Sequence, residues 1–156
     1  MNILRAAEKD FVTVKDITQR TIKAVYPHYY PKGAVDFFLA HHSDENIMRD
    51  IRNGDVFLLL TDDGQAAGTV TTENNEINRL FVLPEYQGYG YGGALLRFAE
   101  ERIAENYDTA ELSVSLPAKA IYLNKGYTFK DYHAIKTANG DYLCYDNMEK
   151  AMLKQK

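Results

Sequence analysis

Four glycines fall within six residues near the middle of the chain, between Gly88 and Gly93. They follow an apolar run that ends at Pro84, which cannot donate to a sheet, and they precede a segment with the apolar spacing of a helix. Such a turn lets successive backbone N–H groups point into one concavity, and the start of the helix adds unpaired N–H groups and a partial positive charge. The stretch from Gln87 to Gly93 is therefore predicted to bind phosphate.

Two common phosphate-binding patterns fit this stretch poorly. It lacks the Gly-x-x-x-x-Gly-Lys-Ser/Thr pattern of the P-loop. Gly88, Gly90 and Gly93 do satisfy the dinucleotide fingerprint Gly-x-Gly-x-x-Gly, which needs glycine directly after the first strand of a parallel βαβ unit. Here residues 84–87 intervene, and Glu111, the acidic residue at the right distance, falls at the start of a strand rather than its end. A flexible glycine-rich turn is the plainer alternative.

A third pattern fits better. Gln87, Gly90 and Gly92, in the order Gln-x-x-Gly-x-Gly after a strand ending Val-Leu-Pro, resemble the acyl-CoA pyrophosphate loop of the GNAT superfamily of N-acyltransferases. A second segment is similar to the same family, in which a short helix ends Tyr-x-x-x-Gly-Phe/Tyr, here from Tyr122 to Tyr127. The two motifs and the order of elements cover nearly the whole chain. The resemblance implies one α/β domain over residues 1–156, with a central mixed, mostly antiparallel seven-stranded sheet flanked by about four helices.

The order of elements can also be read from the residues. A first strand over residues 2–7 and helices over 11–25, 34–42 and 45–52 precede three strands joined by tight turns, at 56–60, 67–72 and 76–82. Tight turns make neighbouring strands antiparallel. The helix after the glycines crosses over to a strand at 109–114, which we expect to lie parallel to 76–82. A terminal hairpin over 128–136 and 142–149 completes the sheet.

Composition excludes several classes of function. The chain has 156 residues and a net charge of −4, so a basic surface for nucleic acid is not expected. We find neither a bilayer-spanning apolar run nor a signal-peptide pattern, and the single cysteine, Cys144, excludes an internal disulfide. These features predict a cytoplasmic protein without a membrane partner. We expect no metal, because the histidines lack the spacing of a metal site.

The resemblance assigns the coenzyme contacts, and acetyl-CoA is the expected co-substrate. Pantetheine would lie along the central strand at Phe81, Val82 and Leu83, with the backbone N–H of Val82 as oxyanion donor. The pyrophosphate would lie on the loop formed by Gln87, Gly88, Tyr89, Gly90, Tyr91, Gly92 and Gly93. Ser115 stands where the family usually has asparagine. The loop lacks the family's Arg or Lys, so Lys119, Lys125 and Arg97 are the expected charge partners.

Acetyl transfer to an amine poses three chemical tasks. The amine must lose a proton, the tetrahedral oxyanion needs a donor, and the departing thiolate needs a proton. Glu76 is the candidate base, because one branch of the resembled family has a glutamate on this strand, although a base acting through water, such as Glu73, is an alternative. Tyr122 is the candidate acid, since the family's tyrosine approaches the coenzyme sulfur. The plainer interpretations are a solvated carboxylate and a packed phenol.

The acceptor site is expected near the aromatic segment 26–38. In the resembled family the helices after the first strand border the acceptor pocket, which suggests Tyr26, Tyr29, Tyr30 and Phe37 as substrate contacts, with Asn78 on the central strand. The plainer interpretation is a loop held on the core by its rings. The sequence thus predicts acetyl transfer to a small-molecule or peptide amine in a ternary complex. The alternatives are a coenzyme-binding sensor and an enzyme for longer acyl groups or protein N-termini. A homodimer is also considered, because dimers are common in the family.

Overall fold

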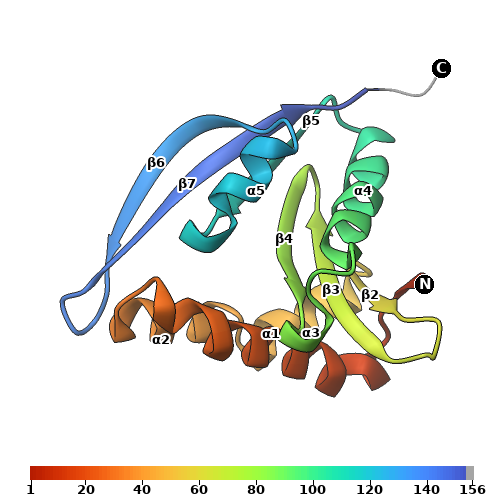
Figure 1. Ribbon diagram of the computed structural model, residues 1–156, viewed down its shortest axis with the longest axis horizontal. Helices are drawn as coiled ribbons and strands as arrows, with labels where there is room; N and C mark the ends of the chain where they lie inside the picture. Colours follow the sequence, from red (N-terminus) through yellow and green to blue (C-terminus); the bar gives the residue numbers. More distant parts are fainter. Residues whose placement is uncertain (154–156) are drawn as a thin grey trace.

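The computed structural model describes residues 1–153 and shows a seven-stranded sheet with helices on both faces (Figure 1). The strands are β1 (Asn2–Arg5), β2 (Val56–Leu60), β3 (Ala66–Glu73), β4 (Glu76–Val82), β5 (Thr109–Val114), β6 (Thr128–Lys136) and β7 (Tyr142–Ala151). The helices are α1 (Phe11–Val25), α2 (Lys32–His41), α3 (Asp44–Arg52), α4 (Tyr91–Ala104) and α5 (Lys119–Asn124). The expected mixed, mostly antiparallel architecture is confirmed.

The strand order is β1-β2-β3-β4-β5-β7-β6. Every neighbouring pair is antiparallel except β4 and β5, which are parallel as the crossover through α4 predicted. Both strands therefore point their carboxyl ends, Val82 and Val114, to the same edge of the sheet. The glycine loop after β4 and the segment that leads from β5 into α5 thus lie on the same side of the molecule.

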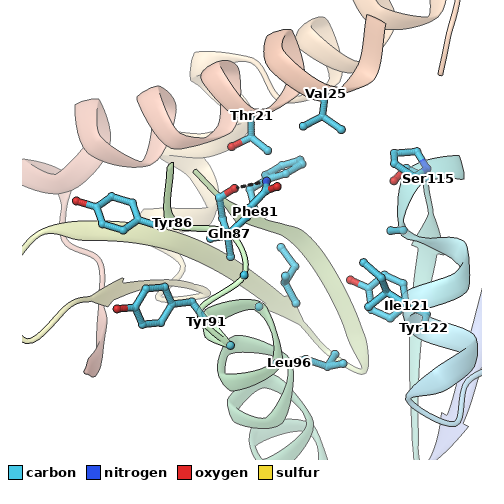
Figure 2. Close-up of a pocket in the computed structure, with 18 of the residues that line it drawn as sticks. Thr21, Val25, Phe81, Tyr86, Gln87, Tyr91, Leu96, Ser115, Ile121 and Tyr122 are labelled. Atoms are coloured by element: carbon cyan, nitrogen blue, oxygen red, sulfur yellow. Dashed lines mark hydrogen bonds between the residues drawn. The ribbon is translucent and has the colours of Figure 1, made fainter. Parts of the chain in front are cut away.

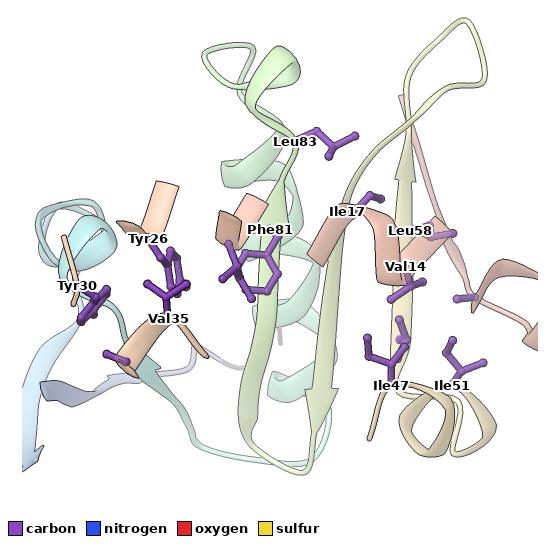
Figure 3. Close-up of a cluster of buried hydrophobic side chains, with 14 of the residues drawn as sticks. Val14, Ile17, Tyr26, Tyr30, Val35, Ile47, Ile51, Leu58, Phe81 and Leu83 are labelled. Carbon is purple, nitrogen blue, oxygen red and sulfur yellow. The ribbon is translucent and has the colours of Figure 1, made fainter. Parts of the chain in front are cut away.

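The core consists of two hydrophobic clusters, one on each face of the sheet. Side chains of α1, α2 and α3 pack against one face (Figure 3), and α4 packs against the other. Strand β2 serves both clusters, because Val56 and Leu58 point to one face while Phe57 and Leu59 point to the other. Its continuous apolar sequence predicted this burial on both faces.

Strand β4 carries a bulge that changes its course. Thr71 of β3 pairs with Asn78, but Thr69 pairs with Phe81, so three steps along β4 match two along β3. Arg79 lies in this bulge at a φ of 45°, a left-handed conformation that is uncommon for residues other than glycine. Pairing of β4 with β5 does not extend beyond Ile77 and Leu112. The central sheet is therefore open between the carboxyl halves of β4 and β5.

Local capping explains where α3 begins but not where α1 begins. Ser43 caps α3, its hydroxyl accepting a hydrogen bond from the Asn46 N–H at 3.3 Å. Asp10 precedes α1 but makes no side-chain cap to that helix, because its carboxylate instead accepts from the N–H of Ala7 at 2.8 Å.

Among residues 1–153, no helix is long and apolar enough to cross a membrane, and no cluster of three metal-ligating side chains occurs.

Candidate active site

The glycine loop presents unpaired backbone N–H groups at the start of α4. Gly88 and Gly90 adopt φ values of 86° and 84°, and a Cβ added at either would meet only open space. Helix α4 begins at Tyr91, and Ala94 is the first residue whose N–H reaches back, to the Gly90 carbonyl at 3.1 Å. The N–H groups of the first turn thus have no acceptor within the helix. Free N–H groups at a helix start favour an anion, and binding of phosphate at this loop stays a prediction.

A cavity of about 500 Å³ opens above this loop, and we call it the glycine-loop cavity (Figure 2). Its floor is the loop from Gln87 to Gly93, and its walls come from α1, the end of β4 and the segment around α5. The Gln87 side chain donates to the Val82 carbonyl at 3.0 Å, which fixes the loop against the strand it follows. The volume lies within the usual range for small-molecule sites.

Two cations border the glycine end of this cavity. A Cβ built on Gly93 would lie 3.5 Å from Arg97 Nη1 and 3.7 Å from Lys125 Nζ. Neither cation forms an ion pair with a carboxylate of residues 1–153. Lys119, in contrast, pairs with Asp146 at 3.1 Å and lies over the Phe129 ring, and it does not line the glycine-loop cavity. The unpaired charges that favour an anion near the loop are therefore those of Arg97 and Lys125.

The N–H of Val82 is turned toward the open side of β4. Successive N–H groups of a strand point to opposite edges, and the neighbouring Leu83 N–H donates to Ala67 of β3 at 2.9 Å. The Val82 N–H therefore faces β5, at a place where the two strands no longer pair. Val82 also lines the glycine-loop cavity. This arrangement leaves a backbone donor directed at the space between the strands.

A second cavity, of about 390 Å³, adjoins the first on the side of α2 and the terminal hairpin. We call it the aromatic cavity, because Tyr26, Phe37, Phe38, Phe81 and Tyr145 contribute to its wall. The two cavities share the residues Tyr26, Leu80, Phe81, Ser115, Ala118 and Tyr122. The two cavities therefore adjoin along these residues.

Tyr122 lies at this junction and keeps its proton. Burial raises the pKa of its phenol above the usual value, and the nearby Tyr26 raises it further. Its ring packs edge-on against Tyr127 with centroids 5.6 Å apart, which fixes its orientation on α5. Burial likewise raises the pKa of Tyr26, while a hydrogen bond with Ser115 opposes that shift. The junction thus holds two neutral phenols whose hydroxyls can donate hydrogen bonds.

Beneath the aromatic cavity, Arg79 is held by three side chains. Its guanidinium pairs with Asp50, donates to Thr71 Oγ1 at 3.2 Å and donates to His42 Nδ1 at 3.0 Å. Because Nδ1 accepts this bond, the neutral His42 ring carries its proton on Nε2. Burial, and next the Arg79 charge, lower the pKa of His42 to about 3. Both side chains line the cavity, but the positive charge of Arg79 is already balanced by Asp50.

Comparison with known proteins agrees with this geometry. Residues 25–151 match the sequence pattern of the family described as the acetyltransferase (GNAT) domain. This chain belongs to the GNAT acetyltransferase family. No curated protein sequence shows a significant match to it.

Solved structures share the fold of this GNAT acetyltransferase at low sequence identity. A GCN5-related N-acetyltransferase from Rhodopseudomonas palustris is 20% identical, with a TM-score of 0.84 over 96% of this chain and 94% of its own. The PaiA N-acetyltransferase from Thermoplasma acidophilum, solved with coenzyme A, is also 20% identical, with a TM-score of 0.72 over 96% and 98%. YncA from Salmonella typhimurium, solved with acetyl-CoA, is 15% identical, with a TM-score of 0.73 over 100% and 96%.

Most of the residues expected in the GNAT site line one of the two cavities. The expected residues that line the glycine-loop cavity are Phe81, Val82, Gln87, Gly88, Gly90, Tyr91, Gly92, Gly93, Ser115, Lys125 and Tyr122. Those that line the aromatic cavity are Tyr26, Phe37, Asn78 and Glu76. Glu76 lies at the exposed start of β4, six residues before Val82, which is about 20 Å for a fully extended strand. Its carboxylate therefore lies at the opposite end of β4 from Val82.

Other expected residues lie outside both cavities. Leu83 is buried in the core, and Tyr89 is exposed and stacks on Tyr91 with centroids 6.0 Å apart. Tyr29 is also exposed, whereas the buried Tyr30 hydroxyl accepts a hydrogen bond from the Leu116 N–H at 2.6 Å. Tyr30 therefore orders the segment that leads into α5, rather than facing an acceptor.

Several residues that line the site were not singled out from the sequence. Thr21 and Val25 of α1 line the glycine-loop cavity, and the buried Thr21 hydroxyl has no partner among residues 1–153 (Figure 2). His42 and Arg79 line the aromatic cavity. The only sequence signal for Thr21 is its place on the apolar stripe of α1, which predicted core packing rather than a site. Arg79 carried no signal, because the residue in the left-handed conformation is itself neither glycine nor asparagine.

Proposed function

We propose that this GNAT acetyltransferase moves the acetyl group of acetyl-CoA to a primary amine by direct attack in a ternary complex. The observation that carries the proposal is the junction of the two cavities, where Tyr122 and the end of β4 face both. The coenzyme would lie in the glycine-loop cavity, as coenzyme A and acetyl-CoA are present in the solved PaiA and YncA relatives. The amine would enter from the aromatic cavity.

The glycine-loop cavity suits the coenzyme in three respects. The free N–H groups at the start of α4 fit a pyrophosphate, and Arg97 and Lys125 add positive charge beside Gly93. Pantetheine would follow the open edge of β4, where the unpaired Thr21 hydroxyl offers a further polar contact. The coenzyme supplies the activated acetyl group, and the residues of this chain position it.

Each chemical task then has a candidate residue. The nitrogen of a neutral amine attacks the thioester carbonyl, and the Val82 N–H stabilises the negative charge that forms on the oxygen. The new C–N bond remains when the C–S bond breaks, and the Tyr122 hydroxyl supplies the proton to the departing sulfur. The pKa of Tyr122 is raised by burial, so this proton is present before the reaction.

Once the C–N bond has formed, the nitrogen gives up one proton, which restores through solvent the proton that Tyr122 gave to the sulfur. An acceptor that begins as an ammonium ion must also lose a proton before the attack. With an ordinary amine pKa of about 10.4, fewer than roughly one acceptor in a thousand is neutral near pH 7. Glu76 lines the aromatic cavity, but at the far end of β4, so it would receive this proton through a chain of water molecules. The chemistry is completed without an acyl-enzyme intermediate, since the amine attacks the thioester itself.

The proposal is tested by turnover. Purified protein is incubated with acetyl-CoA and a panel of primary amines, and free thiol is followed together with the mass of the amine product. Release of one thiol for each acetylated amine is expected for at least one acceptor. Tight coenzyme binding without turnover on a broad panel would instead favour a coenzyme-binding sensor.

A further inference from the structure

We propose that the acceptor is an arylalkylamine, a primary amine carried on a compact aromatic body that occupies the aromatic cavity. This inference rests on the proposed function and specifies its substrate class. Three observations support it: the aromatic wall of the cavity, the lack of an available cation in it, and the contact that holds α2 and the terminal hairpin together beside it.

The wall of the cavity suits an aromatic ring. Phe38 meets Tyr26 edge-on with centroids 4.6 Å apart, which fixes one side of the cavity. Phe37, from the same helix, is only partly buried and stacks on His41 with centroids 6.2 Å apart. Tyr145 of β7 contributes a further ring. Aromatic rings are favoured next to such walls, because offset and edge-to-face contacts add to the burial of apolar surface.

The charges of the cavity fit an amine better than a carboxylate. Arg79 is the only arginine or lysine that lines the cavity in the described part of the chain, and its positive charge is balanced by Asp50. His42 is neutral, since its pKa is lowered and its Nδ1 accepts from Arg79. The carboxylate that lines the cavity is that of Glu76. A carboxylate on the acceptor would therefore lose its solvation without gaining a partner. A protonated amine, in contrast, meets no unbalanced positive charge in the cavity.

A contact between α2 and the terminal hairpin holds together two elements that line the cavity. The N–H of Gly33 donates to Asp141 Oδ2 at 2.9 Å (the tip of the β6–β7 hairpin reaches α2 in Figure 1). Gly33 packs so closely that an added Cβ would collide with Asn139 and Thr137 of the hairpin. Hairpin residues Ile135, Leu143 and Tyr145 line the same cavity as Phe37 and Phe38 of α2. A cavity of about 390 Å³ has the size of a site for a small molecule.

The first test compares acceptors that differ in one feature. The kcat/KM for 2-phenylethylamine is measured against butylamine, which lacks the ring, and against phenylalanine, which adds a carboxylate. Spermidine and a short peptide with a free N-terminus complete the panel. We expect 2-phenylethylamine to exceed each of the others by about tenfold or more, a difference of about 1.4 kcal/mol in transition-state binding. Equal use of phenylalanine, or preference for spermidine or the peptide, would overturn the inference.

The second test separates the inference from the proposed function. Binding of 2-phenylethylamine to the coenzyme-A-loaded protein is measured by calorimetry, so that the result does not depend on turnover. Phe37→Ala is expected to weaken this binding about tenfold. Phe37→Leu removes the ring but keeps an apolar side chain, and it serves as the control for a folding defect in Phe37→Ala. Tyr132→Ala removes an exposed ring outside both cavities and should bind like the wild type.

The outcomes of the two tests are distinct. Absence of turnover with every amine would count against the proposed function alone, and the calorimetry would then decide the inference. Binding of 2-phenylethylamine that Phe37→Ala weakens would support the aromatic acceptor site. Undetectable binding, or binding that Phe37→Ala leaves unchanged in a folded protein, would overturn it.

Discussion

The guanidinium of Arg79 on β4 forms an ion pair with the carboxylate of Asp50 on α3, and only 5% and 6% of the two side chains are exposed. Arg79 lies in the bulge at a φ of 45°, close to where β4 stops pairing with β5. The ion pair therefore connects α3 to the residue at which the sheet opens. An ion pair this deeply buried contributes little net stability when intact, but the loss of one partner leaves an uncompensated charge.

Asp50→Asn is expected to destabilise the fold strongly. The substitution keeps the size of the side chain but leaves the Arg79 charge buried without a counterion. We expect the free energy of unfolding, measured by urea denaturation, to fall by about 3–5 kcal/mol. Asp36→Asn is the matched control, because Asp36 forms an exposed ion pair with Lys32 on α2, and its loss should change stability little. Similar stabilities of the two variants would contradict the structural role of the buried pair.

His42 should make stability depend on pH. Its pKa in the folded protein is lowered to about 3, while the unfolded chain titrates near 6.5. Between these values the unfolded state binds more protons, so the free energy of unfolding must decrease as pH falls from about 6.5 toward about 3. One proton contributes at most about 1.4 kcal/mol per pH unit. For His42→Gln, the free energy of unfolding measured over the same range should depend less steeply on pH than for the wild type. His28→Gln is the control, because His28 is exposed. Identical slopes for the wild type and both variants would rule out this role of His42.

Tyr122→Phe should lower kcat and leave coenzyme affinity unchanged. The hydroxyl acts on the departing sulfur, and a general acid typically contributes about 10²-fold or more in rate. Because burial raises the pKa of Tyr122, the wild type should show no loss of activity from its ionisation across neutral pH. Tyr127→Phe is the matched control, since the buried Tyr127 hydroxyl has no partner among residues 1–153. Full activity of Tyr122→Phe would exclude the acid role.

Glu76→Gln should reduce activity most at low pH, where the amine is hardest to deprotonate. The carboxylate lies at the far end of β4, so its effect would pass through water and depend on its charge. The pH profile of kcat/KM is the appropriate measurement, because a merely structural change would scale the whole profile. Asp63→Asn serves as control, since Asp63 is exposed in the β2–β3 turn and lines neither cavity. An unchanged profile for Glu76→Gln would assign the proton transfer to another group.

The sequence predicted the sheet well, because its signals are local. Alternating and continuous apolar runs mark the strands, tight turns make β2, β3 and β4 antiparallel, and the crossover through α4 makes β5 parallel to β4. The glycine loop was predictable for a similar reason, since φ values near 85° at Gly88 and Gly90 are the ones that glycine adopts readily.

The acceptor side was harder to predict, because it depends on contacts between distant segments. Nothing in the spacing of Tyr29 and Tyr30 distinguishes an exposed ring from one that binds Leu116, a residue 86 positions away. Arg79 adopts a left-handed conformation without glycine or asparagine, held by Asp50 and His42 from other elements. Lys119 forms an ion pair with Asp146 instead of being available to bind phosphate, and the sequence of α5 alone does not reveal this pairing.

The coenzyme affinity of Gly90→Asp tests the central claim most directly, with Gly64→Asp as its matched control. Both glycines have left-handed φ values, +84° and +79°, with open space where a Cβ would lie, so the two substitutions impose comparable strain. Only Gly90 lies at the start of α4, where the added carboxylate would repel a pyrophosphate. Calorimetry with coenzyme A should show at least about a 100-fold loss of affinity for Gly90→Asp and wild-type affinity for Gly64→Asp. Wild-type affinity of a folded Gly90→Asp variant would contradict the account.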